Sequence, residues 1–273
     1  MKDKISLAGD LGSGKSTVAK ILIRELGAEK YATGEAMRKF AEQLGMTVGE
    51  FNVYMETHPE YDKLIDEGLM ALSEDERFLI IDSRMAWHFT KGTFKIYLST
   101  DIETSSLRIM SANRPGEHDA TLEETMKNTR LRRESEKKRY SELYGVDIKD
   151  LTNYTLVVDT TVAGPEEIAE LIITSFGKWQ NDRLGKWCFI SPERLNYPDD
   201  APDELKLMEY SSMLEEGEQL PEITVFEIDG EFYLKDGLEA ALAYSLNKRL
   251  FIPTTLTRGT ADGKNYVRMK NSL

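Results

Sequence analysis

The chain has 273 residues, of which 40% are apolar, and this is enough to bury one large core or two smaller ones. Its net charge of −13 argues against a nucleic-acid partner, because phosphate backbones are bound by clustered Lys and Arg. The single cysteine, Cys188, excludes an internal disulfide and a cysteine-based metal cluster.

Neither a membrane span nor a signal peptide is predicted. No run of 18 apolar residues occurs, and the first residues, MKDKISLAGD, lack the apolar segment of a signal peptide. We therefore expect a cytoplasmic protein without a membrane partner.

Short apolar runs rich in β-branched and aromatic residues predict buried strands at 4–10, 78–82, 94–99 and 154–160. Apolar residues at helical spacing predict helices at 16–26, 35–44, 60–72, 101–112, 119–143 and 165–176. Strands that alternate with helices indicate an α/β fold, in which helices cover both faces of a parallel sheet.

The pattern changes after residue 178. A strand at 186–190 precedes a turn-rich segment, a helix at 203–217, a helix at 238–249 and a strand at 250–258. Between these helices, two alternating runs flank Asp229-Gly230 in 223–237, which is typical of a β-hairpin. We therefore expect two domains, an α/β domain at 1–180 and a small α+β domain at 186–273.

A phosphate-binding loop follows the first predicted strand. LAGDLGSGKSTVA (7–19) fits the pattern G-x-x-x-x-G-K-[ST] and opens a predicted helix, which is the context of a P-loop NTPase. Lys15 is expected to reach the β- and γ-phosphates, and the Ser16 hydroxyl to ligate Mg²⁺. The residues expected to bind ATP here are Gly9, Asp10, Leu11, Gly12, Ser13, Gly14, Lys15, Ser16 and Thr17.

Two polar residues follow the strand at 78–82. Asp82 ends the strand where a Walker-B-type carboxylate would lie near the metal, although an ordinary strand-end residue is the alternative. Arg84 follows at the carboxyl end of the sheet, where ligands of open α/β sheets bind.

A basic helix, RLRRESEKKRY (130–140), places Arg132, Glu136 and Arg139 within an arc of about 60° on one face. Two guanidiniums beside a carboxylate suit a phosphate and a base edge, and a solvated helix with ion pairs is the alternative. Upstream, Arg108 and Arg114 precede a Pro-Gly turn, and such a segment can close over phosphates.

The remaining reactive side chains are assigned no catalytic role. His58, His88 and His118 share no spacing, so we interpret them as surface or structural residues. Cys188 lies in an apolar run and is expected to be a buried core thiol.

Residues 1 to about 178 resemble the nucleoside monophosphate kinases, and most closely the archaeal-type cytidylate kinases. The resemblance runs in chain order through GDLGSGKSTVAKIL, ATGEAMRKFAEQLGMTVGEF, HPEYDKLIDE, FLIIDSRMA, KIYLS and RRESEKKRYSELYGVDIKDLTNYTLVVDT. It implies transfer of the ATP γ-phosphate to CMP or dCMP. It also implies a set of residues that bind the acceptor, namely Thr33, Gly34, Arg38, Asp82, Arg84, Arg132, Glu136 and Arg139.

The same resemblance implies that Arg108 and Arg114 lie in a lid and contact ATP. Lys15, Arg84 and Arg132 are then expected to be catalytic, because phosphoryl transfer needs positive charge around a loose transition state. Ser83 stands where the family usually has Gly, and Ala112 where a second lid arginine is common. Two alternatives stay open: a kinase of another nucleotide or small metabolite, and a nucleotide-gated regulatory protein.

The strings ISPERL and LEEGEQLPEITVFEIDGEFYLKDGLEAALAYSLNKRLFIPTTL resemble the ParB/sulfiredoxin-like fold. That family often has an arginine after the hairpin, facing a nucleotide or phosphate, whereas Asp236–Ala240 here reads DGLEA. We therefore expect an inactive regulatory or interaction domain with a protein or small-ligand partner.

Overall fold

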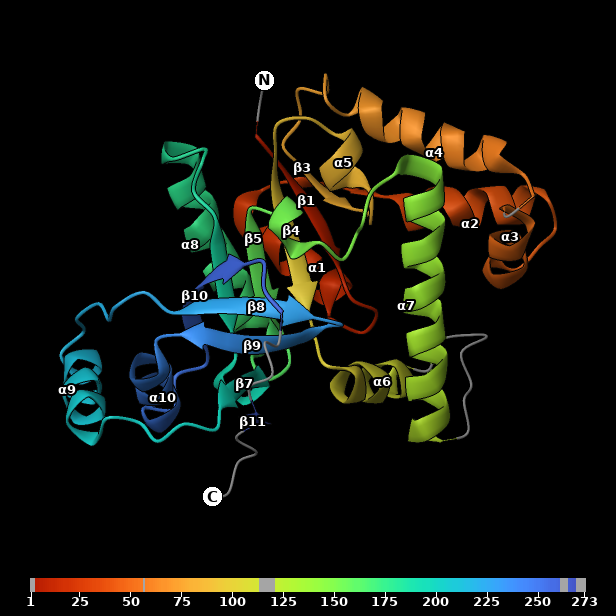
Figure 1. Cartoon of the computed structure of the whole chain (residues 1–273). Helices are drawn as coiled ribbons and strands as arrows, with labels where there is room; N and C mark the ends of the chain where they lie inside the picture. Colours follow the sequence, from red (N-terminus) through yellow and green to blue (C-terminus); the bar gives the residue numbers. More distant parts are fainter. Residues whose placement is uncertain (1–2, 56, 113–120, 261–264, 269–273) are drawn as a thin grey trace.

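The computed structural model describes residues 3–55, 57–112, 121–260 and 265–268 (Figure 1). In this part of the chain, the strands form one sheet in the order β11-β7-β9-β8-β10-β6-β5-β4-β1-β3-β2. The strands are β1 (Lys4–Gly9), β2 (Glu29–Ala32), β3 (Leu79–Asp82), β4 (Thr93–Ser99), β5 (Leu156–Asp159), β6 (Trp187–Ile190), β7 (Leu195–Pro198), β8 (Thr224–Ile228), β9 (Glu231–Asp236), β10 (Ile252–Thr257) and β11 (Tyr266–Arg268). No helix among these residues is both long enough and apolar enough to span a bilayer.

The helices alternate with the parallel strands β1 to β6, as the sequence predicts, and the chain ends in an α+β unit. They are α1 (Lys15–Leu26), α2 (Thr33–Gln43), α3 (Val48–Met55), α4 (Pro59–Ala71), α5 (Ala86–Phe89), α6 (Ile102–Ser111), α7 (Leu122–Tyr144), α8 (Pro165–Asn181), α9 (Glu204–Glu215) and α10 (Leu238–Leu246). The fold is therefore a P-loop α/β fold, with helices on both faces of a parallel sheet.

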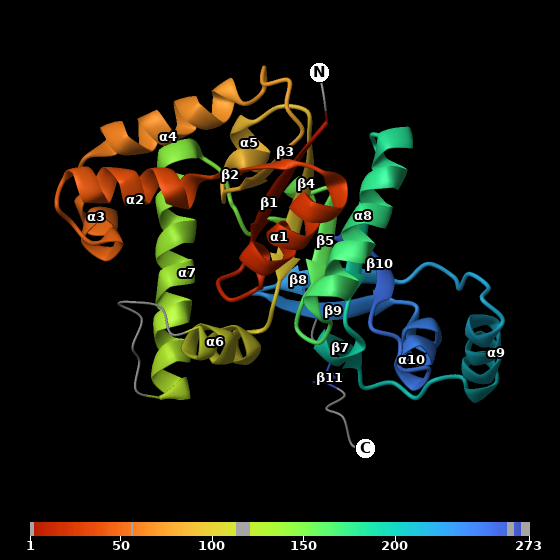
Figure 2. The ribbon, with the colours of Figure 1, turned by 180° about the vertical axis from the view of Figure 1, so that it is seen from behind.

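One face of the parallel strands is covered by α1 and α8, which lie side by side in front of the sheet in Figure 2. Every second strand residue, such as Ile5, Leu7, Leu156 and Val158, enters the core beneath these helices. The helices bury their own apolar stripe there, including Leu22.

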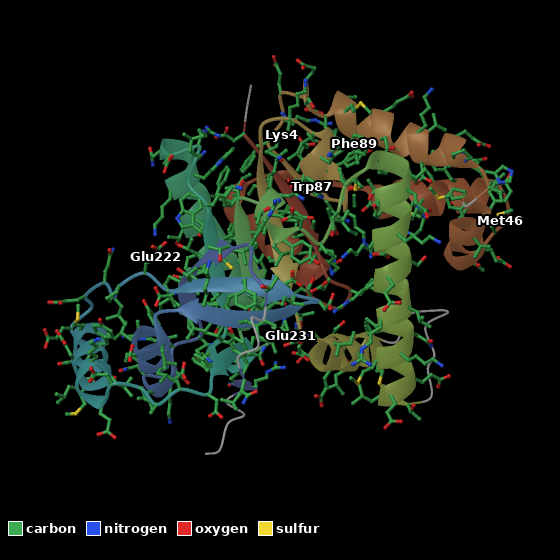
Figure 3. The ribbon with its side chains drawn as sticks, viewed as in Figure 1. Lys4, Met46, Trp87, Phe89, Glu222 and Glu231 are labelled. Carbon is green, nitrogen blue, oxygen red and sulfur yellow. The ribbon has the colours of Figure 1, made fainter. Side chains whose placement is uncertain are left out.

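The core on the opposite face extends from α4 and α5 into the C-terminal part. Trp87 of α5 (Figure 3) belongs to the same cluster as Cys188 of β6 and Phe232 of β9. The sheet is also continuous, since β6 pairs with β5 in parallel and with β10 in antiparallel fashion. The segment after residue 186 therefore shares both its sheet and its core with the preceding residues.

The hairpin around Asp229-Gly230 is confirmed, and both residues have the positive φ that a tight primed turn requires, 51° and 87°. The elements that the sequence analysis left unpredicted are short, namely β2, α3, α5, β7 and β11. α8 ends at residue 181, five residues later than predicted, because Phe176 and Trp179 keep its apolar stripe buried.

Helix α7 positions the candidate site. In both views it runs beside the sheet, from α4 at one end to α6 at the other (Figures 1 and 2). It makes side-chain bonds to α4 and packs against α6. A long helix held at both ends presents one continuous face of side chains to the carboxyl ends of β1 and β3.

Candidate active site

The phosphate loop has the backbone that its glycines predict. Gly12 and Gly14 adopt φ values of 70° and 80°, which L side chains rarely adopt. A Cβ on Gly12 would lie 2.5 Å from the carbonyl oxygen of Ser105 on α6, so only glycine fits against that helix. The loop leads directly into α1, and the N-terminus of this helix places partial positive charge beside the loop.

Lys15 is partly buried at the centre of the loop, where its Nζ donates to the carbonyl oxygens of Gly9 and Asp10, both at 2.9 Å. Burial, together with the nearby Arg84, lowers the pKa of Lys15 to about 8. A polyanion bound beside Lys15 would stabilise the charged form of the amine and raise this pKa again.

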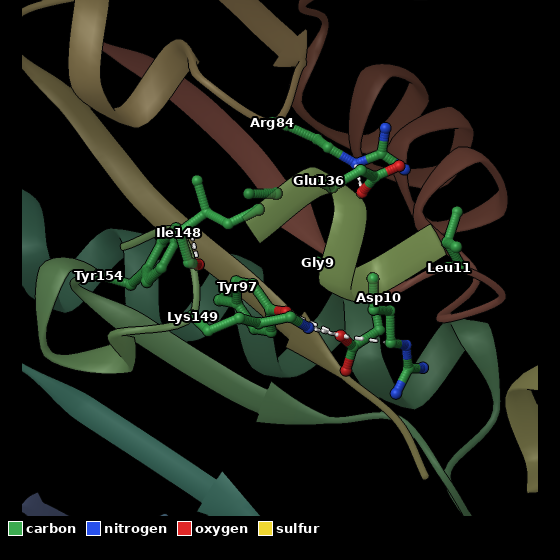
Figure 4. A pocket seen from close by; sticks show the side chains of 11 residues that line it. Gly9, Asp10, Leu11, Arg84, Tyr97, Glu136, Ile148, Lys149 and Tyr154 are labelled. Carbon is green, nitrogen blue, oxygen red and sulfur yellow. Dashed lines mark hydrogen bonds and ion pairs between the residues drawn. The ribbon is translucent and has the colours of Figure 1, made fainter. Parts of the chain in front are cut away.

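Asp10 ties the loop to the elements behind it. Its carboxylate accepts from the Tyr97 hydroxyl at 2.8 Å and from the Thr100 N–H at 3.1 Å, and pairs with Lys149 (Figure 4). Arg133 of α7 lies 3.8 Å away. Although burial alone would raise the pKa of Asp10, Lys149 and Arg133 hold it well below its usual range. Asp10 thus anchors the loop from behind.

A first cavity, of about 350 Å³, opens in front of the loop, and we call it the phosphate cavity. Ser16 and Asp82 both line it, which brings the two predicted metal ligands to one place. A further hollow of about 360 Å³ lies between Gly12–Gly14, Arg108 and the 163–168 segment. Arg108 donates to the carbonyl oxygen of Thr160 at 2.8 Å and is therefore held at the side of the loop.

A second large cavity, of about 430 Å³, lies between α2, α4 and α7, and we call it the acceptor cavity. The residues that line both this cavity and the phosphate cavity are Thr33, Gly34, Met37, Arg38, Ser83, Arg84 and Arg132. The two cavities therefore adjoin at a group of arginines opposite Lys15.

Glu136 organises two of these arginines. Its carboxylate lies 2.9 Å from Arg84 Nε (Figure 4) and 3.4 Å from Arg132 Nε. Burial opposes the charge of Arg84, but Glu136 raises its pKa, so the guanidinium stays charged. The carboxylate thus fixes two cations at the junction of the cavities.

Arg139 lines the same cavity but pairs with a carboxylate on another helix. Its Nη2 lies 2.6 Å from Oδ1 of Asp62 on α4. One turn further along α4, Asp66 accepts a hydrogen bond from the Tyr144 hydroxyl at 2.6 Å. Burial raises the pKa of Asp62, although Arg139 opposes the shift, and raises that of Asp66 to about 6.

Sequence reasoning missed Asp62 and Asp66. The available signal was their four-residue spacing on a predicted helix, which places both on one face. What the sequence did not show is that this face turns toward α7.

The histidines and Cys188 are assigned no catalytic role, and the structure places those that it describes outside the two cavities. Arg114 and His118 lie outside the described residues. His58 stacks on Tyr54 at 3.6 Å, and His88 lies on α5, so neither reaches the cavities. Cys188 is buried, as predicted, and burial raises the pKa of its thiol to about 12.

Comparison with known proteins gives matches to the first two thirds of the chain. The sequence profile described as "Cytidylate kinase-like family" matches residues 4–162. A cytidylate kinase from Archaeoglobus fulgidus is 37% identical over 171 residues, which cover 62% of this chain and 92% of that protein.

A relative from Lacinutrix mariniflava, named an S-adenosylmethionine-dependent nucleotide dehydratase, is 37% identical over 179 residues. The match covers 65% of this chain but only 37% of that longer protein. A solved structure of an uncharacterized protein from Eubacterium ventriosum has a TM-score of 0.51 at 13% identity. It covers 64% of this chain and 99% of that chain, and this likeness concerns the fold alone.

Proposed function

The chain belongs to the cytidylate kinase-like family, and from this premise we propose that it transfers the γ-phosphate of ATP to CMP or dCMP. Family membership supports a nucleotide kinase, and the choice of acceptor is our proposal. The observation that carries it is the junction of two cavities at Arg84 and Arg132, opposite Lys15.

In this proposal the phosphate loop holds the triphosphate, and the acceptor cavity holds the monophosphate. The loop N–H groups and Lys15 bind the β- and γ-phosphates, and Arg108 borders the hollow beside the loop. Arg38, Arg84 and Arg132 bind the acceptor phosphate at the junction. The two phosphates then meet in line, with guanidiniums around the group that moves.

The donor set fits Mg²⁺. Ser16 offers a hydroxyl oxygen and Asp82 a carboxylate oxygen to the same cavity, and hard oxygen ligands are what Mg²⁺ prefers. Bound there, Mg²⁺ would neutralise phosphate charge, while Lys15 and the arginines orient the reacting groups.

The test is a coupled assay of ADP release with CMP, dCMP, UMP, AMP and GMP, each with ATP and Mg²⁺. We expect turnover that depends on the acceptor and is highest with CMP or dCMP. Arg132→Ala should raise the acceptor KM far more than the ATP KM, because its guanidinium faces the acceptor. Absence of acceptor-dependent turnover with every monophosphate would overturn the proposal.

For the C-terminal part we propose a regulatory or interaction role rather than catalysis. Its contacts support this role, because Arg194 reaches Asp159 at the end of β5, next to residues that hold the phosphate loop. Substitution of exposed residues there, such as Leu205→Ser, should leave turnover unchanged. Loss of turnover in such a variant would contradict the proposal.

A further inference from the structure

The acceptor cavity has two chemically different ends. Near the phosphate loop it is bordered by Arg84 and Arg132, and at the far end by Arg139 and Tyr144. Along α7, Arg132 and Arg139 are separated by about 10 Å, at 1.5 Å per residue. This distance is comparable with the length of a nucleoside monophosphate, so a phosphate at the first end places its base at the second.

At the far end, each of two carboxylates uses only one of its oxygens to accept a hydrogen bond from the protein. Asp62 accepts from Arg139 through Oδ1, and Asp66 accepts from Tyr144 through Oδ2. Among the described residues, the other oxygen of each carboxylate accepts no further hydrogen bond. Arg139 Nε is buried and likewise has no partner within the described chain. Three residues that line this cavity therefore each carry a polar atom without a hydrogen-bond partner in the described chain: Arg139 Nε and the second carboxylate oxygens of Asp62 and Asp66.

The remaining walls suit a flat ring. Tyr140 and Tyr144 line the cavity with their rings at 21° to each other, and Ile65, Leu69 and Met85 supply apolar surface. A heteroaromatic base can lie against such walls while its polar edge meets the carboxylates and the guanidinium.

Glu136, which the sequence analysis places among the acceptor-binding residues, is engaged at the phosphate end of the cavity. Both of its oxygens face arginines at the phosphate end, Arg84 and Arg132. With one oxygen on each guanidinium, this carboxylate has neither oxygen free to accept from a base. The carboxylates available at the far end come from α4.

The chemistry of the bases then discriminates. An ionised carboxylate only accepts hydrogen bonds, and a guanidinium only donates them. Cytosine offers an amino group to the first and a ring nitrogen and carbonyl oxygen to the second. Uracil carries the carbonyl oxygen O4 where cytosine carries its amino group, and a carboxylate repels this acceptor. The 6-oxo edge of guanine is disfavoured for the same reason.

We propose that Asp62, Asp66 and Arg139 form a base-reading subsite that selects an amino-bearing pyrimidine, cytosine, over uracil. This inference rests on the proposed function, since it assigns the base of the same acceptor. Asp62 and Asp66 accept from the exocyclic amino group, and Arg139 donates to the neighbouring ring acceptors.

The experiment compares Asp62→Asn and Asp66→Asn with the natural chain. Asparagine keeps the size of the side chain but adds donors, which tolerate the O4 of uracil. We expect the ratio of kcat/KM for CMP to that for UMP to fall about 10- to 100-fold, as for loss of a charged hydrogen bond. The ATP KM should stay unchanged, because the donor lies at the other end of the site.

The matched control is Glu67→Gln, on the same helix, where Glu67 is exposed and pairs with Lys63. It should leave the CMP-to-UMP ratio unchanged. Each variant is first checked for a cooperative thermal transition, and Asp66→Asn keeps an acceptor for Tyr144. An unchanged ratio in both folded Asp variants would overturn the inference while leaving the kinase proposal intact.

Two further arms separate the inference from the proposed function. AMP carries the same amino and ring-nitrogen edge on a larger base, so a natural chain that prefers AMP would overturn the assignment to cytosine. Calorimetric titration with CMP alone needs no turnover. We expect Asp62→Asn to weaken CMP binding, and equal binding by both proteins would refute the subsite even if no kinase activity were found.

Discussion

Replacing Arg194 by methionine tests how strongly the C-terminal part is built into the nucleotide-binding part. Arg194 and Asp159 are both fully buried, with Arg194 Nε 3.4 Å from Asp159 Oδ1. Asp159 also accepts from Thr161 and from the Ser191 N–H, so it joins the end of β5 to the segment after β6. Arg194→Met removes the cation and leaves this carboxylate buried beside an apolar side chain.

The expected loss of unfolding free energy is about 3–5 kcal/mol, the usual cost of leaving one charge of a buried pair uncompensated. Urea unfolding measures it, with the midpoint falling at constant m-value. Asp159→Asn/Arg194→Met should recover about half of the loss, because neither charge remains. The control, Arg258→Met, breaks an exposed pair with Asp150 and should cost less than about 1 kcal/mol.

Two results would refute this reasoning. A loss below about 1 kcal/mol in Arg194→Met would show that the pair is effectively solvated. A double variant no more stable than Arg194→Met would show that the loss arises from packing around the methionine rather than from the stranded carboxylate.

Three further predictions concern the site itself. Lys15→Met should lower kcat by at least about 10²-fold with little change in thermal stability, because we propose that its ammonium group binds the β- and γ-phosphates; near-normal turnover would contradict this. Gly12→Ala should abolish the rise in melting temperature that ATP produces, since its Cβ would meet the Ser105 carbonyl; a full ATP-induced rise would contradict the loop geometry. Asp66→Asn should stabilise the fold above pH 6 by about 1–2 kcal/mol, allowing for solvent screening, and this gain should shrink toward zero as the pH falls below about 4. The folded pKa of Asp66, about 6, lies above its unfolded value, so the stability of the natural chain falls as the pH rises from about 4 to about 6. If the melting temperatures of the natural chain and Asp66→Asn differed by the same amount at every pH from 4 to 8, the assignment would be disproved.

The sequence predicted the elements whose patterns depend on neighbouring residues alone. Strand β1, the glycine loop and α1 follow from one motif. The loop needs backbone angles that glycine adopts readily, and the glycines are visible in the sequence. The Asp229-Gly230 turn is predictable for the same reason. The face of α7 that carries Arg132, Glu136 and Arg139 follows from helical spacing, and all three line one cavity.

What the sequence could not supply were partners from distant elements. Nothing near Glu136 in the sequence indicates that its carboxylate pairs with Arg84, 52 positions earlier. Nor does the sequence indicate that Arg139 pairs with Asp62 rather than with Glu136 on its own helix. These pairings depend on how α4 and α7 pack across the cavity, and packing is a property of the whole core rather than of a local pattern. Short elements such as β2 were missed because four residues carry too little periodicity to be distinguished from a loop.

The end of β5 connects the two parts of the chain through adjacent residues. Asp159 meets Arg194 of the C-terminal part, and Thr160 donates to Ser13 of the phosphate loop while its carbonyl accepts from Arg108. A ligand that shifted the C-terminal part would pull on the first residue, and the peptide plane would transmit this displacement to the second. Close packing leaves little free space in which such a shift could be absorbed before it reached the loop. The regulatory role that we propose for the C-terminal part would act through these contacts, and it would require neither a catalytic residue nor the arginine that DGLEA lacks.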